Sequence, residues 1–92
     1  MARKAWSTER KWEKSKLETN FERKAQEHGF TILGWREYVS KTDYLLTKED
    51  VDIEISIHNL TGIKVHDCIK WLENCWEVRA TYLEARREIT RE

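Results

Sequence analysis

The chain has 92 residues, of which 39% are hydrophobic and 37% charged, and its 17 Lys and Arg balance 17 Asp and Glu. This length holds one domain with one core, and a net charge of zero gives no overall reason to expect nucleic-acid or membrane binding. The sequence has no apolar run near the roughly 20 residues that span a bilayer and no apolar secretion signal at its start, so we expect a cytoplasmic protein without membrane contact.

The first predicted element is a helix over residues 8–28, which contain no Gly or Pro and are rich in Glu, Lys and Arg. Ser7 or Thr8 would cap its start, and Gly29 would follow its end. Trp12 falls away from the apolar stripe of this helix and is expected to face solvent. An exposed indole there can stack on a base or fill a partner's pocket, or it can lie over the stems of neighbouring Lys and Arg side chains.

Three short strands are predicted over residues 30–58, joined by tight polar connections in an antiparallel meander. The clearest is VDIEISIH, residues 51–58, in which Val51, Ile53, Ile55 and Ile57 alternate with polar residues. On a helix these four side chains would scatter to opposite sides, whereas on a strand they share one face. We therefore expect one buried face and one wet, acidic face.

A second helix is predicted over residues 62–90, because residues 63–90 contain no Gly or Pro. At 1.5 Å per residue it would be roughly 42 Å long, against about 26 Å for an eight-residue strand, so it should extend past the sheet. Its apolar positions form two adjacent stripes. The first contains Val65, Ile69, Leu72, Trp76 and Leu83, and the second contains Cys68, Trp71, Cys75, Val78, Tyr82, Ala85 and Ile89.

The second stripe follows alternating spacings of three and four residues, a heptad pattern sustained for three repeats. One interpretation is that both stripes form a single wide core face. The other is an interface for a homodimer or a partner helix along Val78, Tyr82, Ala85 and Ile89, where the helix leaves its own sheet. With these elements, the sequence predicts a single α+β domain in the order αβββα, with a three-stranded antiparallel sheet packed against both helices.

Catalytic signals are weak. The three His and two Cys are scattered, and the three Gly form no phosphate-binding loop. Cys68 and Cys75, seven residues apart on one helix, would lie about 10 Å apart, too far for a disulfide, which leaves two free thiols suited to a reducing compartment. We expect no enzyme activity, catalytic residue, metal or cofactor.

The leading functional hypothesis is protein binding, because five Trp are more than a core of this size usually holds. The partner would be a larger host or phage protein that this chain regulates or inhibits, or a second copy in a homodimer. The expected binding residues lie on the second helix: Trp71, Val78, Tyr82, Ala85 and Ile89.

The alternative hypothesis is nucleic-acid binding through the N-terminal helix, since residues 1–28 contain eight Lys and Arg against five Glu. Interleaved Glu residues weaken it, because Glu–Lys pairs on a solvated helix would give the same pattern. The residues expected to contact phosphates or bases are Arg3, Lys4, Arg10, Lys11, Trp12, Lys14, Lys16 and Arg23.

Residues 37–68 resemble short β-meander zinc-ribbon modules found in phage proteins and near homing endonucleases. The matching positions are Tyr38, Ser40, Lys41, Thr42, Asn59, Leu60 and Gly62. The metal site does not carry over, because residues 48–50 replace the first ligand pair and only Cys68 stands near the second. The resemblance implies a metal-free meander of phage or mobile-element origin.

A second resemblance is to the helix-turn-helix of the histone-like HU family. Similar positions are Thr61, Gly62, Ile63, Asp67, Cys68, Leu72 and Trp76. This resemblance implies a helix over residues 51–60, which conflicts with their alternating pattern, and it leaves no sequence for the basic DNA-binding arms.

Overall fold

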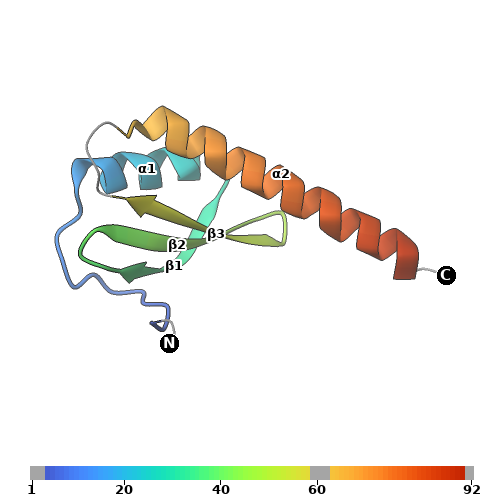
Figure 1. Cartoon of the computed structure of the whole chain (residues 1–92), viewed down its shortest axis with the longest axis horizontal. Helices are drawn as coiled ribbons and strands as arrows, with labels where there is room; N and C mark the ends of the chain where they lie inside the picture. Colours follow the sequence, from blue (N-terminus) through green and yellow to red (C-terminus); the bar gives the residue numbers. More distant parts are fainter. Residues whose placement is uncertain (1–3, 59–62, 91–92) are drawn as a thin grey trace.

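The computed structural model describes residues 4–58 and 63–90 (Figure 1). The elements follow in the order α1 (Lys16–Glu27), β1 (Thr31–Glu37), β2 (Lys41–Lys48), β3 (Val51–His58) and α2 (Val65–Thr90). Both helices cover one face of the sheet. The α+β class and the order αβββα predicted from the sequence are confirmed.

The sheet is an antiparallel meander with strand order β1-β2-β3. Glu49 and Asp50 form the two-residue turn between β2 and β3, with φ of 51° and 63°. Left-handed conformation at both turn residues suits the right-handed twist of a hairpin, and Asp tolerates it better than most residues. This turn fixes the register in which Val51 pairs with Lys48.

The core lies between the sheet and the helices. Val51, Ile53, Ile55 and Ile57 of β3 are all buried, as the alternation predicted. They pack with α1 and α2 in a single cluster that also includes Phe21, Ala25, Phe30, Tyr44, Leu46, Cys68, Ile69 and Leu72. The strand at residues 51–58 also occupies positions that an HU-type helix-turn-helix would need to be helical.

The first helix is shorter than predicted. It begins at Lys16, where Ser15 accepts a hydrogen bond from the backbone of Glu18, and the Glu18 side chain accepts one from the backbone of Ser15. This capping box satisfies two N–H groups at the helix start. The expected start at residue 8, with Ser7 or Thr8 as cap, is therefore wrong.

The residues that precede this helix form the N-terminal segment (residues 4–15), which contains no helix and runs beside β1. The Ser7 N–H donates to the Trp35 carbonyl at 2.8 Å, and the Trp35 N–H donates back at 3.0 Å. A helical extension of eight residues has little stability of its own, so these long-range contacts outweigh the local preference.

A β-bulge allows the N-terminal segment to approach β1. The register shifts between Ile32 and Gly34, which leaves Leu33 unpaired and exposed. A Cβ atom on Gly34 would lie 3.0 Å from the Ser7 carbonyl oxygen. Only glycine therefore permits this close approach without displacing the segment.

The second helix has 26 residues, or about 39 Å at 1.5 Å per residue. The Trp76 Nε1–H donates to the Lys48 carbonyl at 3.0 Å, which fixes the middle of α2 to the turn between β2 and β3. The last turns of α2 extend beyond the sheet (Figure 1), as the relative lengths predicted.

Candidate functional site

One face of α2 points away from the core and carries large apolar side chains. Trp71 is 49% exposed, Val78 71% and Tyr82 49%. Cys75 between them is partly buried, and Ala85 is exposed. We call the face formed by these five residues the outward face; the side chain of Ile89, which the sequence assigned to the same stripe, lies outside the described residues.

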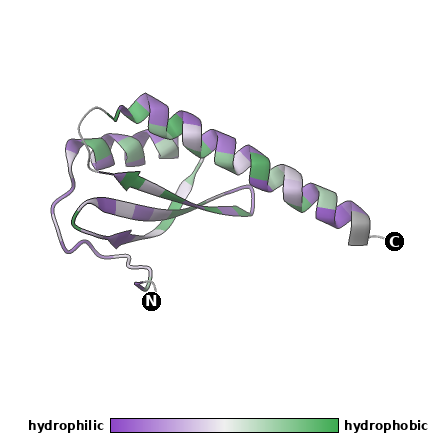
Figure 2. Cartoon of the chain, viewed as in Figure 1, coloured by the Kyte–Doolittle hydropathy of each residue, from purple (hydrophilic) through white to green (hydrophobic). Residues whose placement is uncertain are grey.

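The two stripes predicted on this helix have different environments. Ile69 and Leu72 of the first stripe are buried, and its other members are partly buried against the same core. Among the members of the second stripe whose side chains are described, Cys68 is buried and Cys75 partly buried, whereas the others are exposed. The interpretation of both stripes as one wide core face is therefore wrong, because Trp71, Val78 and Tyr82 are exposed. Figure 2 shows that hydrophobic residues also continue along α2 past the end of the sheet.

A shallow hollow lies in the outward face between the two aromatic rings. Within the described part of the chain it is lined only by residues of α2: Trp71, Asn74, Cys75, Val78, Arg79 and Tyr82. The Tyr82 ring is flanked by two guanidinium groups, with its centroid 5.5 Å from Cζ of Arg79 and 6.0 Å from Cζ of Arg86. Trp, Tyr and Arg are the residue types that contribute most often to strong protein–protein contacts.

Arg10, predicted to contact phosphates, is instead directed into the protein. Its guanidinium is paired with Glu22, lies 3.7 Å from Glu18 and 3.5 Å from Glu37, and donates a hydrogen bond of 3.2 Å to the Tyr44 hydroxyl. Burial alone would lower the pKa of Arg10, but Tyr44 and the neighbouring carboxylates outweigh it and raise the pKa. Arg10 is a permanently charged structural group.

Two of the other cations predicted to contact phosphates have partners within the chain. Lys4 donates to the Glu37 carbonyl and Lys14 donates to Glu22 at 3.3 Å. The remaining described cations of this set are exposed: Lys11, Lys16 and Arg23. Arg3 lies outside the described residues.

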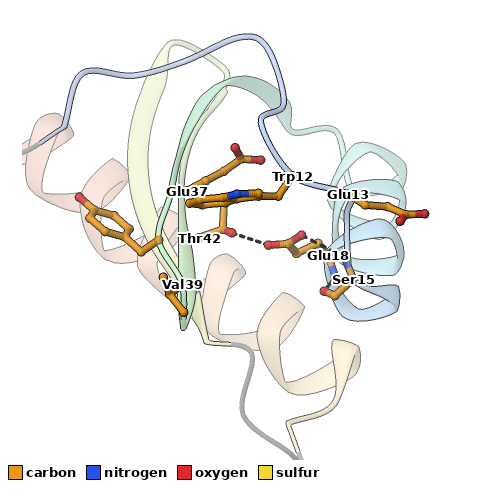
Figure 3. A pocket seen from close by; sticks show the side chains of 8 residues that line it. Trp12, Glu13, Ser15, Glu18, Glu37, Val39 and Thr42 are labelled. Atoms are coloured by element: carbon orange, nitrogen blue, oxygen red, sulfur yellow. Dashed lines mark hydrogen bonds between the residues drawn. The ribbon is translucent and has the colours of Figure 1, made fainter.

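Trp12 is half-exposed, as expected, but it lies in the N-terminal segment and not on a helix. Its ring crosses a small pocket beside Glu37 and Thr42 (Figure 3). The Thr42 hydroxyl donates to Glu18, and the Lys11 N–H donates to Glu37 at 2.9 Å. Glu18, Glu37 and Thr42 of this pocket are thus already paired within the chain.

A second buried charged group was not foreseen from the sequence. Arg36 is 4% exposed on the sheet face opposite the helices, paired with Glu54 and 3.6 Å from Asp43. Its Cζ lies 3.7 Å from the centroid of the Trp6 ring. The face expected to be wet and acidic is therefore partly covered, because the N-terminal segment places Trp6 over Arg36. No local sequence pattern predicts these two contacts, since Trp6 and Glu54 both lie far from Arg36 in the sequence.

The two thiols are free, as predicted. Burial raises the pKa of Cys68, with a contribution from Asp67, and burial also raises the pKa of Cys75. Both therefore stay protonated near neutral pH. Within residues 4–58 and 63–90, no three His, Cys, Asp or Glu side chains lie close enough together to hold a metal ion, and neither helix is long and apolar enough to cross a membrane.

No family model, curated protein or solved structure matches this chain. The resemblances to phage β-meander modules and to the HU family stay predictions, and four of the positions on which they depend, residues 59–62, lie outside the described residues.

Proposed function

We propose that this chain is a non-enzymatic protein-binding module that docks through the outward face of α2. The observation that carries the proposal is the exposure of Trp71, Val78 and Tyr82 on a single helix face. In a chain of this size, three large apolar side chains are left in water although Ile69 and Leu72 of the same helix are buried in the core. Contiguous exposed apolar surface of this kind is typical of a protein contact site.

The geometry of the N-terminal segment favours this proposal over nucleic-acid binding. The guanidinium of Arg10 lies against three carboxylates, and Lys4 and Lys14 have partners within the chain. A phosphate would have to compete with these partners for the cations. Catalysis is also disfavoured, because the raised pKa of Cys68 and of Cys75 makes both thiols poor nucleophiles.

The sequence-based hypothesis of a phage-type regulator or inhibitor acting on a larger protein fits this mode of action. It rests on the resemblance of residues 37–68 alone. The two free thiols support a reducing compartment such as the cytoplasm.

The test is site-specific photo-crosslinking in whole cells that produce the protein. A photoreactive amino acid at position 78 should give a discrete adduct, whose mass identifies the second chain. The matched control is position 39, because Val39 is 94% exposed and lies in the turn between β1 and β2, beside the Trp12 pocket. Adducts at 39 and none at 78 would contradict the proposal and would move the binding site to the Trp12 pocket.

A further inference from the structure

We infer that the outward face of α2 binds the same face of a second copy, with the two helices antiparallel around a two-fold axis. This inference rests on the proposed function and specifies its partner. Three features of α2 support it: the order of large and small side chains, the distribution of charge, and the position of the core relative to the outward face.

The side chains along the outward face are self-complementary. In the order Trp71, Cys75, Val78 and Tyr82, an aromatic ring stands at each end and two smaller side chains stand between them. If two helices run antiparallel about a point between residues 76 and 77, Cys75 of one copy lies opposite Val78 of the other. The same register places Trp71 opposite Tyr82, so each hollow between two rings receives the small side chains of the other copy.

The charges on α2 favour the antiparallel direction. Residues 64–77 contain two Lys and three acidic residues, a net charge of −1, whereas residues 78–90 contain three Arg and two Glu, a net charge of +1. An antiparallel pair brings the acidic half of each helix against the basic half of the other. A parallel pair would align like with like, which is unfavourable.

The position of the core leaves room for the second copy. At 100° per residue, Ile69 lies about 160° and Trp76 about 140° around the helix from the middle of the outward face. The sheet and α1 therefore lie to the side of the contact and do not obstruct it. The last turns of α2, which extend past the sheet, would cover Trp71 of the second copy (Figure 1).

The exposed apolar area of the outward face determines the affinity that we expect for the dimer. A complete aromatic side chain offers about 150–250 Å², so the half-exposed Trp71 and Tyr82 contribute roughly 100 Å² each. Together with Val78 and the polar rim, one helix face gives less than the roughly 800 Å² per partner of a standard interface. We expect a reversible dimer with a Kd on the order of 10 µM.

The first experiment is sedimentation equilibrium of the purified chain up to about 200 µM, well above the expected Kd. The wild type should dimerise, and Val78→Lys should weaken the dimer at least about thirtyfold because the charge falls at its centre. Val39→Lys, the same change at an exposed site in the turn between β1 and β2, should dimerise like the wild type. Circular dichroism of all three establishes that they are equally folded.

The second experiment tests whether the two helices are antiparallel. It uses chains that carry Cys75→Ala, which removes the native thiol from the contact. Asn74 and Thr81 are exposed and face each other across the antiparallel pair. An oxidised mixture of Asn74→Cys and Thr81→Cys chains should give a disulfide-linked heterodimer. Neither variant alone should cross-link, since the two copies of position 74 would lie about 7.5 Å apart along the axis and the two copies of position 81 about 13.5 Å, beyond the roughly 7 Å limit of a disulfide. A rapid Cys75–Cys75 disulfide in the wild type, together with no disulfide between positions 74 and 81 in the mixture, would indicate a parallel pair and would overturn the inference.

The outcomes separate this inference from the proposed function. A chain that stays monomeric at the highest concentration overturns the dimer. If photo-crosslinking at position 78 then yields an adduct with a different protein, the proposed function stands with another partner. A monomer without any adduct at position 78 refutes both, and a dimer that tolerates Val78→Lys places self-association elsewhere, for example at the free edge of β3.

Discussion

Replacing Arg10 by Met tests how the N-terminal segment is held. Methionine keeps the apolar stem of the side chain and removes only the guanidinium. The side chains of Glu18, Glu22 and Glu37 around it are 6%, 12% and 7% exposed, so they would lose a shared cation in a place that water reaches poorly. Removing one partner of a buried ion pair costs about 3–5 kcal/mol.

The lower end of that range applies here. Lys14 remains 3.3 Å from Glu22, and the Lys11 N–H still donates to Glu37. We therefore expect a loss of about 3 kcal/mol in the free energy of unfolding. For a domain of this size, each kcal/mol lowers Tm by about 4–8 °C, which gives a decrease of roughly 12–24 °C.

Urea unfolding followed by circular dichroism measures this loss. Lys11→Met is the matched control, because its side chain is exposed and only its backbone makes the contact with Glu37; it should change stability by less than about 0.5 kcal/mol. Adding Glu22→Gln to Arg10→Met should restore part of the loss, since one unpaired carboxylate is removed. If Arg10→Met is as stable as Lys11→Met, the guanidinium does not hold the segment.

Three further variants or conditions test other contacts. Gly34→Val should cost about 1–3 kcal/mol and increase hydrogen exchange at the Ser7 amide, because the new side chain displaces the N-terminal segment; unchanged exchange would contradict the packing described. Trp76→Phe should cost about 1 kcal/mol, measured by urea unfolding, since the Lys48 carbonyl loses its donor. Burial raises the pKa of Tyr44 far above its ordinary value of 10.0, and the Glu22 bond adds to this although Arg10 opposes it. The unfolded chain therefore loses the Tyr44 proton first, so stability should be unaffected by this group below pH 10 and should fall above it by about 1.4 kcal/mol per pH unit. A Tyr44→Phe variant should show a shallower fall in an alkaline unfolding series, and an identical slope would refute the assignment.

The sequence predicted the elements whose signals are local. The alternation at Val51, Ile53, Ile55 and Ile57 identified β3, because a period of two is incompatible with a helix face. The absence of Gly and Pro after residue 62 identified α2 and its length. The same helix periodicity separated Val78 and Tyr82 from the stripe that packs on the sheet, although it could not decide whether another part of the chain covered them.

Local sequence patterns could not predict where α1 begins or which Lys and Arg side chains pair with carboxylates. The Ser15–Glu18 capping box is visible in the sequence, but residues 8–14 are equally rich in helix formers. They are not helical because Ser7 pairs with Trp35 and Arg10 reaches Glu37, contacts between residues almost 30 positions apart. Whether a Lys or Arg meets solvent or a carboxylate depends on such tertiary pairing, which a charge count does not contain.

The N-terminal segment also affects how the sheet behaves toward other chains. An unpaired strand edge is a template for intermolecular β-pairing, and Ser7 occupies the middle of the outer edge of β1. Detaching the segment would expose the backbone of β1 around Trp35 while leaving the hydrophobic core between the sheet and helices in place. The contacts of Arg10 and Trp6 therefore act as protection against aggregation, and a variant that weakens them could precipitate well below the temperature at which the core itself unfolds.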